Sequence, residues 1–119
     1  MLSLKTALNN QKQQLIREQY NKIYSHELAH KRAGGALAGS IVIERNAQGI
    51  PVAGHVDIKM PSLDKTNPEK TIADARTVIN SAMAPSDPSA QDYKVATRAS
   101  DILAQAEAIK QEQKLNYLA

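Results

Sequence analysis

The sequence contains no cysteine, phenylalanine or tryptophan. Without cysteine the chain has no disulfide bonds and no thiolate ligands for a metal. Its core must be built from aliphatic residues, alanine, methionine and tyrosine. Any bound metal would be held by nitrogen and oxygen atoms, a donor set that suits a catalytic zinc with an open position better than a closed structural zinc.

Long hydrophobic runs and blocks of one charge are missing as well. No window has the length and apolar character of a signal peptide or a membrane span, so we expect no membrane association and, by default, a cytoplasmic location. Export without such a signal and packaging in a virion are the alternatives. The net charge of +3 is spread along the chain. Because no basic block is interleaved with aromatic residues, we expect no nucleic-acid partner.

The length of 119 residues suits one domain covering residues 1–119. Good helix formers with leucine, isoleucine and tyrosine at helical spacing predict a long helix over residues 3–32. Residues 1–12 are more polar, so we expect them to fray or to extend away from the body. Gly34 and Gly35 predict the end of this helix, because glycine readily adopts the left-handed conformation there.

The rest of the chain predicts a β-hairpin followed by two helices. Residues 40–45 and 51–59 are rich in β-branched residues, and residues 46–49 between them have turn chemistry. Asn67 and Pro68 predict a helix start, Pro85 predicts its end, and Asp87 is the expected cap of the last helix. The predicted fold is therefore a small α+β, zincin-like single domain with a long N-terminal helix, one hairpin and two packed C-terminal helices.

The N-terminal helix carries the pattern His-Glu-x-x-His at residues 26–30. Residues four apart lie one turn above each other on a helix, so His26 and His30 point to the same side and can hold one Zn²⁺. Glu27 could then accept a proton from a water that the metal activates. A solvated helix face with two histidines at this spacing is the alternative. The longer metzincin motif is excluded, because Ala33 and Ala36 occupy its glycine and histidine positions.

The third ligand is expected to be His55, the only other histidine of the chain. A catalytic zinc usually has three protein ligands, and alternation along the second strand places His55 and Asp57 on one face. We expect that face to be turned toward His26 and His30. Asp57 would orient an imidazole or replace His55 as a ligand. An exposed or hydrogen-bonded His55 and a solvated Asp57 are the alternatives.

Three blocks together resemble the bacterial SprA-related family, a group described as zinc metalloproteases mainly because of this motif. The similarity covers residues 24–106 and is carried by His26-Glu-Leu-Ala-His30-Lys31 with Gly34-Gly35 and Ala38-Gly39, by Gly49 and Gly54-His55-Val56-Asp57-Ile58, and by Pro68 to Arg76 with residues 84–92. Family members often carry glutamate where His55 stands. Because both residue types bind zinc, the resemblance implies a ligand role at this position.

These patterns together predict a zinc-dependent metallopeptidase that acts on a peptide or protein substrate. His26, His30 and His55 would bind Zn²⁺, and Glu27 would be the general base and then return the proton to the leaving amine. The alternative from another class is a non-catalytic structural or interaction module, such as a component of a phage particle or a secretion assembly, with a vestigial or structural metal site. Hydrolysis of a non-peptide amide would differ only in the substrate.

Overall fold

The N-terminal part of the chain forms one long helix, α1 (Leu4–Gly34), in the computed structural model, which describes residues 3–118. Ser3 caps the helix, because its side chain accepts a hydrogen bond from the Thr6 N–H at 3.1 Å. Gly35 ends it with a positive φ of 53° and donates its N–H to the Lys31 carbonyl. The predicted helix is thus confirmed. Residues 1 and 2 of the segment expected to fray lie outside the described residues, and the segment is helical from Leu4 onward.

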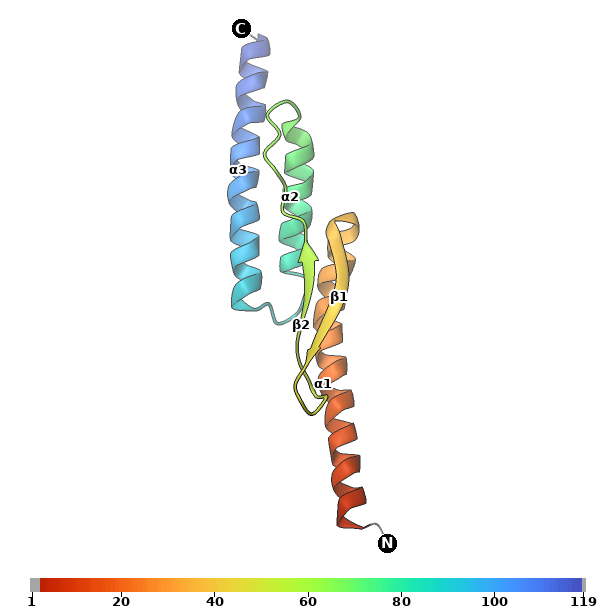
Figure 1. Cartoon of the computed structure of the whole chain (residues 1–119). Helices are drawn as coiled ribbons and strands as arrows, with labels where there is room; N and C mark the ends of the chain where they lie inside the picture. Colours follow the sequence, from red (N-terminus) through yellow and green to blue (C-terminus); the bar gives the residue numbers. More distant parts are fainter. Residues whose placement is uncertain (1–2, 119) are drawn as a thin grey trace.

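A short 3₁₀ turn, η1 (Gly35–Leu37), leads into the predicted hairpin of β1 (Ala38–Arg45) and β2 (Pro51–Ile58). The two strands are antiparallel, with Val42 opposite His55. Asn46 closes the turn, since its Oδ1 accepts the N–H groups of Gln48 and Ile50 at 2.9 and 3.0 Å. The hairpin packs along the C-terminal half of α1 (Figure 1).

The other two helices, α2 (Pro68–Ala82) and α3 (Ala90–Leu118), lie side by side and run in opposite directions (Figure 1). The Asn67 side chain accepts from the Lys70 N–H, which confirms the predicted cap, and α2 ends before Pro85. The core between the helices is made mostly of small side chains, which allow close approach. Its buried hydrophobic members are Ile72, Ala75, Val78, Ala82, Ala99 and Ala106.

The start of α3 differs from the prediction, in which Asp87 was the cap. Ser89 caps this helix, because its Oγ accepts the Asp92 N–H at 3.1 Å while the Asp92 carboxylate accepts the Ser89 N–H at 2.8 Å. This reciprocal pair is a capping box with aspartate as its acidic member. Asp87 is therefore free of the helix end, and its side chain bonds to His26 of α1 instead.

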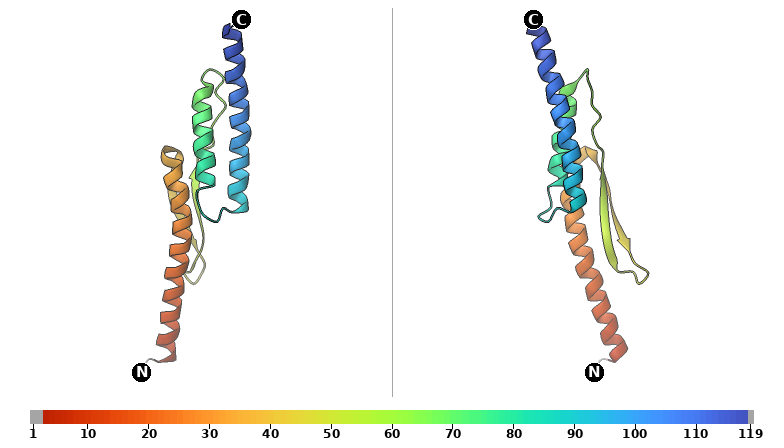
Figure 2. Two further views of the ribbon diagram at one scale, coloured as in Figure 1. Left: turned by 180° about the vertical axis from the view of Figure 1, so that it is seen from behind. Right: turned by 90° about the vertical axis from the view of Figure 1, so that its left-hand side faces the viewer.

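The molecule is elongated, with extents of 85 × 20 × 20 Å and a Cα radius of gyration of 20.8 Å. A compact chain of this length would have a radius of about 13.5 Å. The first half of α1 and the last part of α3 project in opposite directions (Figure 2). The α1–hairpin half and the α2–α3 half meet in the middle of the molecule. No helix among residues 3–118 is long and apolar enough to cross a membrane.

Candidate metal centre

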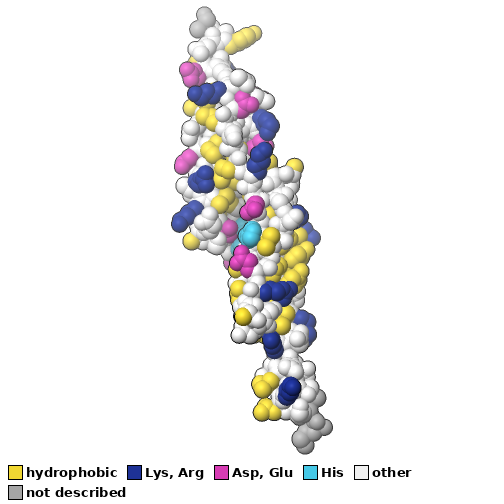
Figure 3. Space-filling view, in the orientation of Figure 1, with side chains coloured by type: hydrophobic (Ala, Val, Ile, Leu, Met, Phe, Trp, Pro, Cys, Tyr) yellow, Lys and Arg dark blue, Asp and Glu magenta, His cyan; other side chains and the backbone are white. Residues whose placement is uncertain are grey.

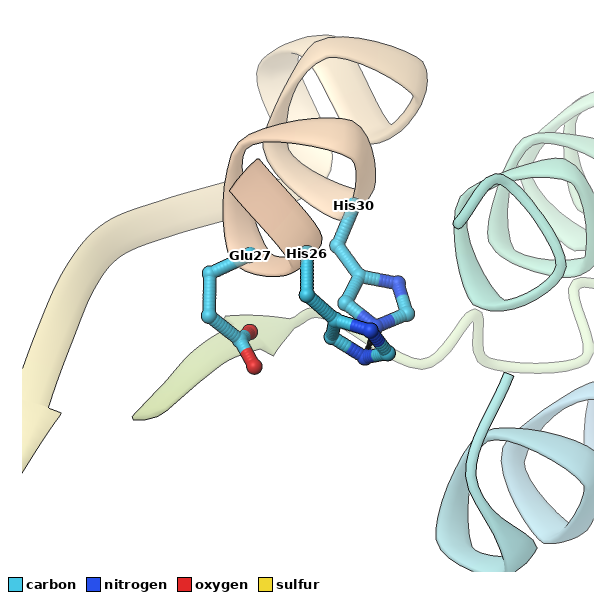
Figure 4. Close-up of side chains that lie close together, drawn as sticks. All are labelled: His26, Glu27 and His30. Carbon is cyan, nitrogen blue, oxygen red and sulfur yellow. Dashed lines mark hydrogen bonds between the residues drawn. The ribbon is translucent and has the colours of Figure 1, made fainter. Parts of the chain in front are cut away.

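His26 and His30 meet in the middle of the molecule, where the two halves join. Their Nε2 atoms are 3.1 Å apart, as the spacing of four residues on α1 predicts (Figure 4). Donor atoms from His26, Glu27 and His30 all lie within 4.8 Å of one another. A space-filling view shows a histidine reaching the surface among acidic side chains at this junction (Figure 3). The His26 side chain is 20% exposed and the His30 side chain 7%, so the group is partly enclosed and still open to small molecules.

Each imidazole is held at its Nδ1 atom by a second residue. The His30 Nδ1 lies 2.7 Å from the Ser81 carbonyl, so it carries the proton and donates to that oxygen. The His26 Nδ1 lies 3.0 Å from Oδ1 of Asp87, a second acceptor. In the neutral rings these bonds place the protons on Nδ1 and leave a lone pair on each of the two neighbouring Nε2 atoms. Outer hydrogen bonds of this kind orient histidine ligands in metal sites.

Asp92 adds a carboxylate beside the two Nε2 atoms. Its Oδ2 lies 3.2 Å from the His26 Nε2, and its Oδ1 lies 3.2 Å from the His30 Nε2. The capping box with Ser89 fixes this side chain at the first turn of α3. Sequence reasoning did not single out Asp92 as a ligand. The pattern Ser-x-x-Asp at residues 89–92 was the available signal, since it places an aspartate at a helix start.

The arrangement of donors fits a zinc ion. For Zn–N distances of 2.0–2.1 Å, neighbouring ligands of a tetrahedral site are separated by about 3.4 Å. The separations among His26, His30 and Asp92 are 3.1 and 3.2 Å, so a small outward movement would suffice. Two imidazoles and a carboxylate also form the nitrogen and oxygen donor set expected for zinc in a chain without cysteine.

The surroundings of the site raise the pKa values of two of its groups, Glu27 and His26. Burial raises the pKa of the Glu27 carboxyl above its ordinary value, although His30 and His26 oppose this change. Burial disfavours the charged form of His26, but the hydrogen bond that His26 donates to Asp87 and the charges of Asp92 and Glu27 outweigh burial and raise the pKa of His26. A metal at this site would therefore compete with a proton for His26.

The β2 strand lies directly against Glu27 because residue 54 is glycine. A Cβ atom at Gly54 would be 2.5 Å from Cγ2 of Ile23 and 3.0 Å from Cγ of Glu27. The contact with Ile23 is too short for a real side chain and the contact with Glu27 is very tight, so a larger residue would force β2 away from α1. The close packing leaves Glu27 7% exposed. Its carboxylate is thus confined beside the two imidazoles.

His55 is not brought into the close group formed by His26, Glu27 and His30. The face of β2 that packs toward α1 carries Gly54, Val56 and Ile58, whereas Ala53, His55 and Asp57 lie on the exposed face. The His55 Nδ1 lies 3.4 Å from Oε1 of Glu44 on the neighbouring strand. The face with His55 and Asp57 is therefore turned away from α1, contrary to the expectation. A ligand role for His55 stays a prediction.

A cavity of about 520 Å³ connects the metal-ligand candidates with the hairpin and α3. His55 and Asp57 line it together with the histidine pair, although their donor atoms are outside the close group of His26, Glu27 and His30. Its walls come from α1, β2 and the first turns of α3, and its lining includes His26, Glu27, His30, residues 53–58, Met60, Ala82, Ser89, Gln91, Asp92, Val95 and Arg98. Its volume lies within the range typical of ligand-binding cavities.

The chain belongs to the SprA-related family, whose model matches residues 3–116. The match is longer than the resemblance over residues 24–106 and includes nearly all of α1 and α3. No curated protein and no solved structure shows significant similarity to the chain. The family is thus established for residues 3–116, whereas the activity depends on the chemistry of the site.

Proposed function

We propose that this protein is a zinc-dependent peptidase in which His26, His30 and Asp92 hold the metal. The observation that carries the proposal is the convergence of two Nε2 atoms and both oxygens of one carboxylate, at separations of 3.1 and 3.2 Å. Both histidines are oriented through their Nδ1 atoms, His26 by the Asp87 carboxylate and His30 by the Ser81 carbonyl. Histidines that were only part of a solvated helix face would not need such support.

The chemistry follows from the position of Glu27. When bound, zinc lowers the pKa of a water molecule and polarises the carbonyl of the scissile amide. Glu27 lies beside both imidazoles on the same turn of α1, and it would accept the proton of the attacking water and return it to the leaving amine. Its burial supports this role, because a raised pKa brings a carboxyl group closer to the pH at which it both accepts and donates a proton.

Metal content and peptide cleavage test the proposal together. Protein without a His tag would be purified, its zinc measured by mass spectrometry, and the same done for His26→Ala and Glu27→Gln. We expect about one zinc per chain in the wild type, little in His26→Ala, and full zinc without peptide cleavage in Glu27→Gln. Near-zero zinc in both the wild type and His26→Ala after zinc loading would end the proposal. Cleavage by Glu27→Gln would remove Glu27 from its role.

One observation favours a non-catalytic metal site as the second candidate. Asp92 belongs to α3 and the histidines belong to α1, and these two helices otherwise make hardly any contact. A metal here would cross-link the two halves of an elongated molecule and thereby stabilise the fold. In that case zinc removal would lower the melting temperature, and zinc-loaded protein would cleave no peptide in a broad substrate library.

A further inference from the structure

We propose that the substrate binds as an extended strand along the free edge of β2, recognised mainly through its main chain. This inference rests on the proposed function and specifies its substrate class as an unfolded or flexible polypeptide segment. Three observations lead to it: the sequence of residues that line the cavity, the unpaired edge of β2, and the position of that edge relative to Glu27.

The cavity follows the edge of β2 rather than one of its faces. Side chains alternate between the two faces of a strand, so a cavity over one face is lined by every second residue. Six consecutive residues, 53–58, line this cavity. Consecutive lining means that side chains of both faces and the main chain between them border the same space. The strand edge therefore forms one wall over about 20 Å.

This edge has free hydrogen-bonding groups. The sheet has two strands, so β2 pairs with β1 on one side only. Within residues 3–118, no backbone hydrogen bond joins residues 53–58 to a segment other than β1. In an antiparallel pair, alternate residues point their N–H and C=O groups away from the partner strand. These groups are available to an added strand, a known way of binding extended peptides.

The free edge passes the candidate catalytic group. Gly54 lies against Glu27, and Ile58 reaches Gly34 at the other end of the same stretch of α1. Asp92 and Val95 of α3 line the cavity together with β2. An extended peptide in this groove would thus carry one of its amide bonds past His26, His30 and Glu27. A helical segment could not take this place, because a helix is about 10 Å across and a strand paired with β2 would lie only about 4.8 Å from it.

A peptide hydroxamate tests this binding mode, because its chelating group is fixed at the metal. The probe is acetyl-Val-Ala-Val-Ala-hydroxamate, together with variants that carry one N-methyl group at each amide in turn. Binding to the zinc-loaded wild-type protein would be measured by calorimetry, with acetohydroxamate as the reference. We expect the peptide to bind at least about tenfold more tightly than acetohydroxamate, and N-methylation to weaken it about five- to tenfold at every second amide and little at the others.

Equal effects at all amides, or no gain over acetohydroxamate, would overturn the strand-like binding mode while leaving the metal site intact. Absence of acetohydroxamate binding together with absence of zinc would instead overturn the proposed function. In that case the edge is tested without metal. The corresponding peptide amide is added at millimolar concentration, and the hydrogen exchange of the protein's backbone amides is measured with and without it. Protection at alternate residues among 53–58, with none on the outer edge of β1, supports the inference, and unchanged exchange along β2 contradicts it.

Discussion

His30 and Ser81 are joined by two hydrogen bonds that run in opposite directions. The His30 ring donates from Nδ1 to the Ser81 carbonyl at 2.7 Å, and the Ser81 hydroxyl donates to the His30 carbonyl at 2.7 Å. Both residues are buried, and they lie 51 positions apart in the chain. This pair fixes α1 on the C-terminal end of α2 and at the same time sets the proton position of one metal-ligand candidate. The same pair of residues therefore holds the two helices together and orients the His30 ring.

The Ser81→Ala substitution separates these two effects. It removes the hydroxyl but keeps the carbonyl that orients His30. We expect a loss of about 1–2 kcal/mol in the free energy of unfolding and nearly unchanged zinc content, because the Nδ1 bond remains. Urea denaturation and metal analysis measure the two quantities. Ser100→Ala, at an exposed position of α3, is the control. A large loss of zinc in Ser81→Ala at full stability would contradict this division of roles.

Asp92 and His55 compete for the role of third ligand, and single substitutions distinguish them. We expect Asp92→Asn to weaken zinc binding at least about tenfold, since it removes a charged donor that contacts both histidines, and His55→Ala to change it little. Competition with a chelating dye measures both affinities. The opposite result would establish His55 as the ligand, as the sequence predicted, and would show that its side chain joins the histidine pair when zinc binds.

Gly54→Ala should disturb the site through packing. The added methyl group would lie 2.5 Å from Ile23 and 3.0 Å from Glu27, so β2 must move away from α1. We expect a loss of about 1–3 kcal/mol in stability. Peptide cleavage should fall more than zinc content, because Glu27 moves while the histidines are held from the other side. Gly39→Ala in the neighbouring strand is a matched control, since its new methyl group meets atoms only at 3.4 and 3.9 Å. Equal stability of the two variants would contradict the contact.

Asp64 should make the fold sensitive to acid. Hydrogen bonds from the Thr66 hydroxyl and from the N–H groups of Asn67 and Thr66 lower the pKa of Asp64 below its ordinary value of 3.8. The unfolded chain therefore binds this proton more readily, so the stabilisation is present above about pH 4 and is lost as the pH falls through the folded-state pKa.

The Asp64→Asn substitution tests this linkage. We expect lower stability at neutral pH and a shallower loss of stability below about pH 4 than in the wild type. Thr66→Val, which removes the largest contribution, should shift the curve in the same direction by a smaller amount. Urea midpoints between about pH 2.5 and 7 measure the effect. Parallel curves for the wild type and Asp64→Asn would contradict it.

The sequence by itself determined the local structure and half of the site. The spacing of His26 and His30 fixes their shared direction on α1, and the Asn67-Pro68 and glycine signals define helix ends, because these preferences act between residues close in the chain. The Ser-x-x-Asp pattern before α3 is a local signal of the same kind. It predicts Ser89, rather than Asp87, as the cap of that helix.

Only the tertiary structure decided which distant side chains join the histidine pair. Asp87 and Asp92 are more than 55 residues from His26, and their approach depends on how α2 and α3 pack against α1. The orientation of the hairpin was equally undetermined, because strand alternation defines two faces without saying which one meets the helix. Gly54 allows its own face to pack on α1 and thereby turns His55 outward. Local periodicity places residues on an element, whereas long-range packing selects their partners.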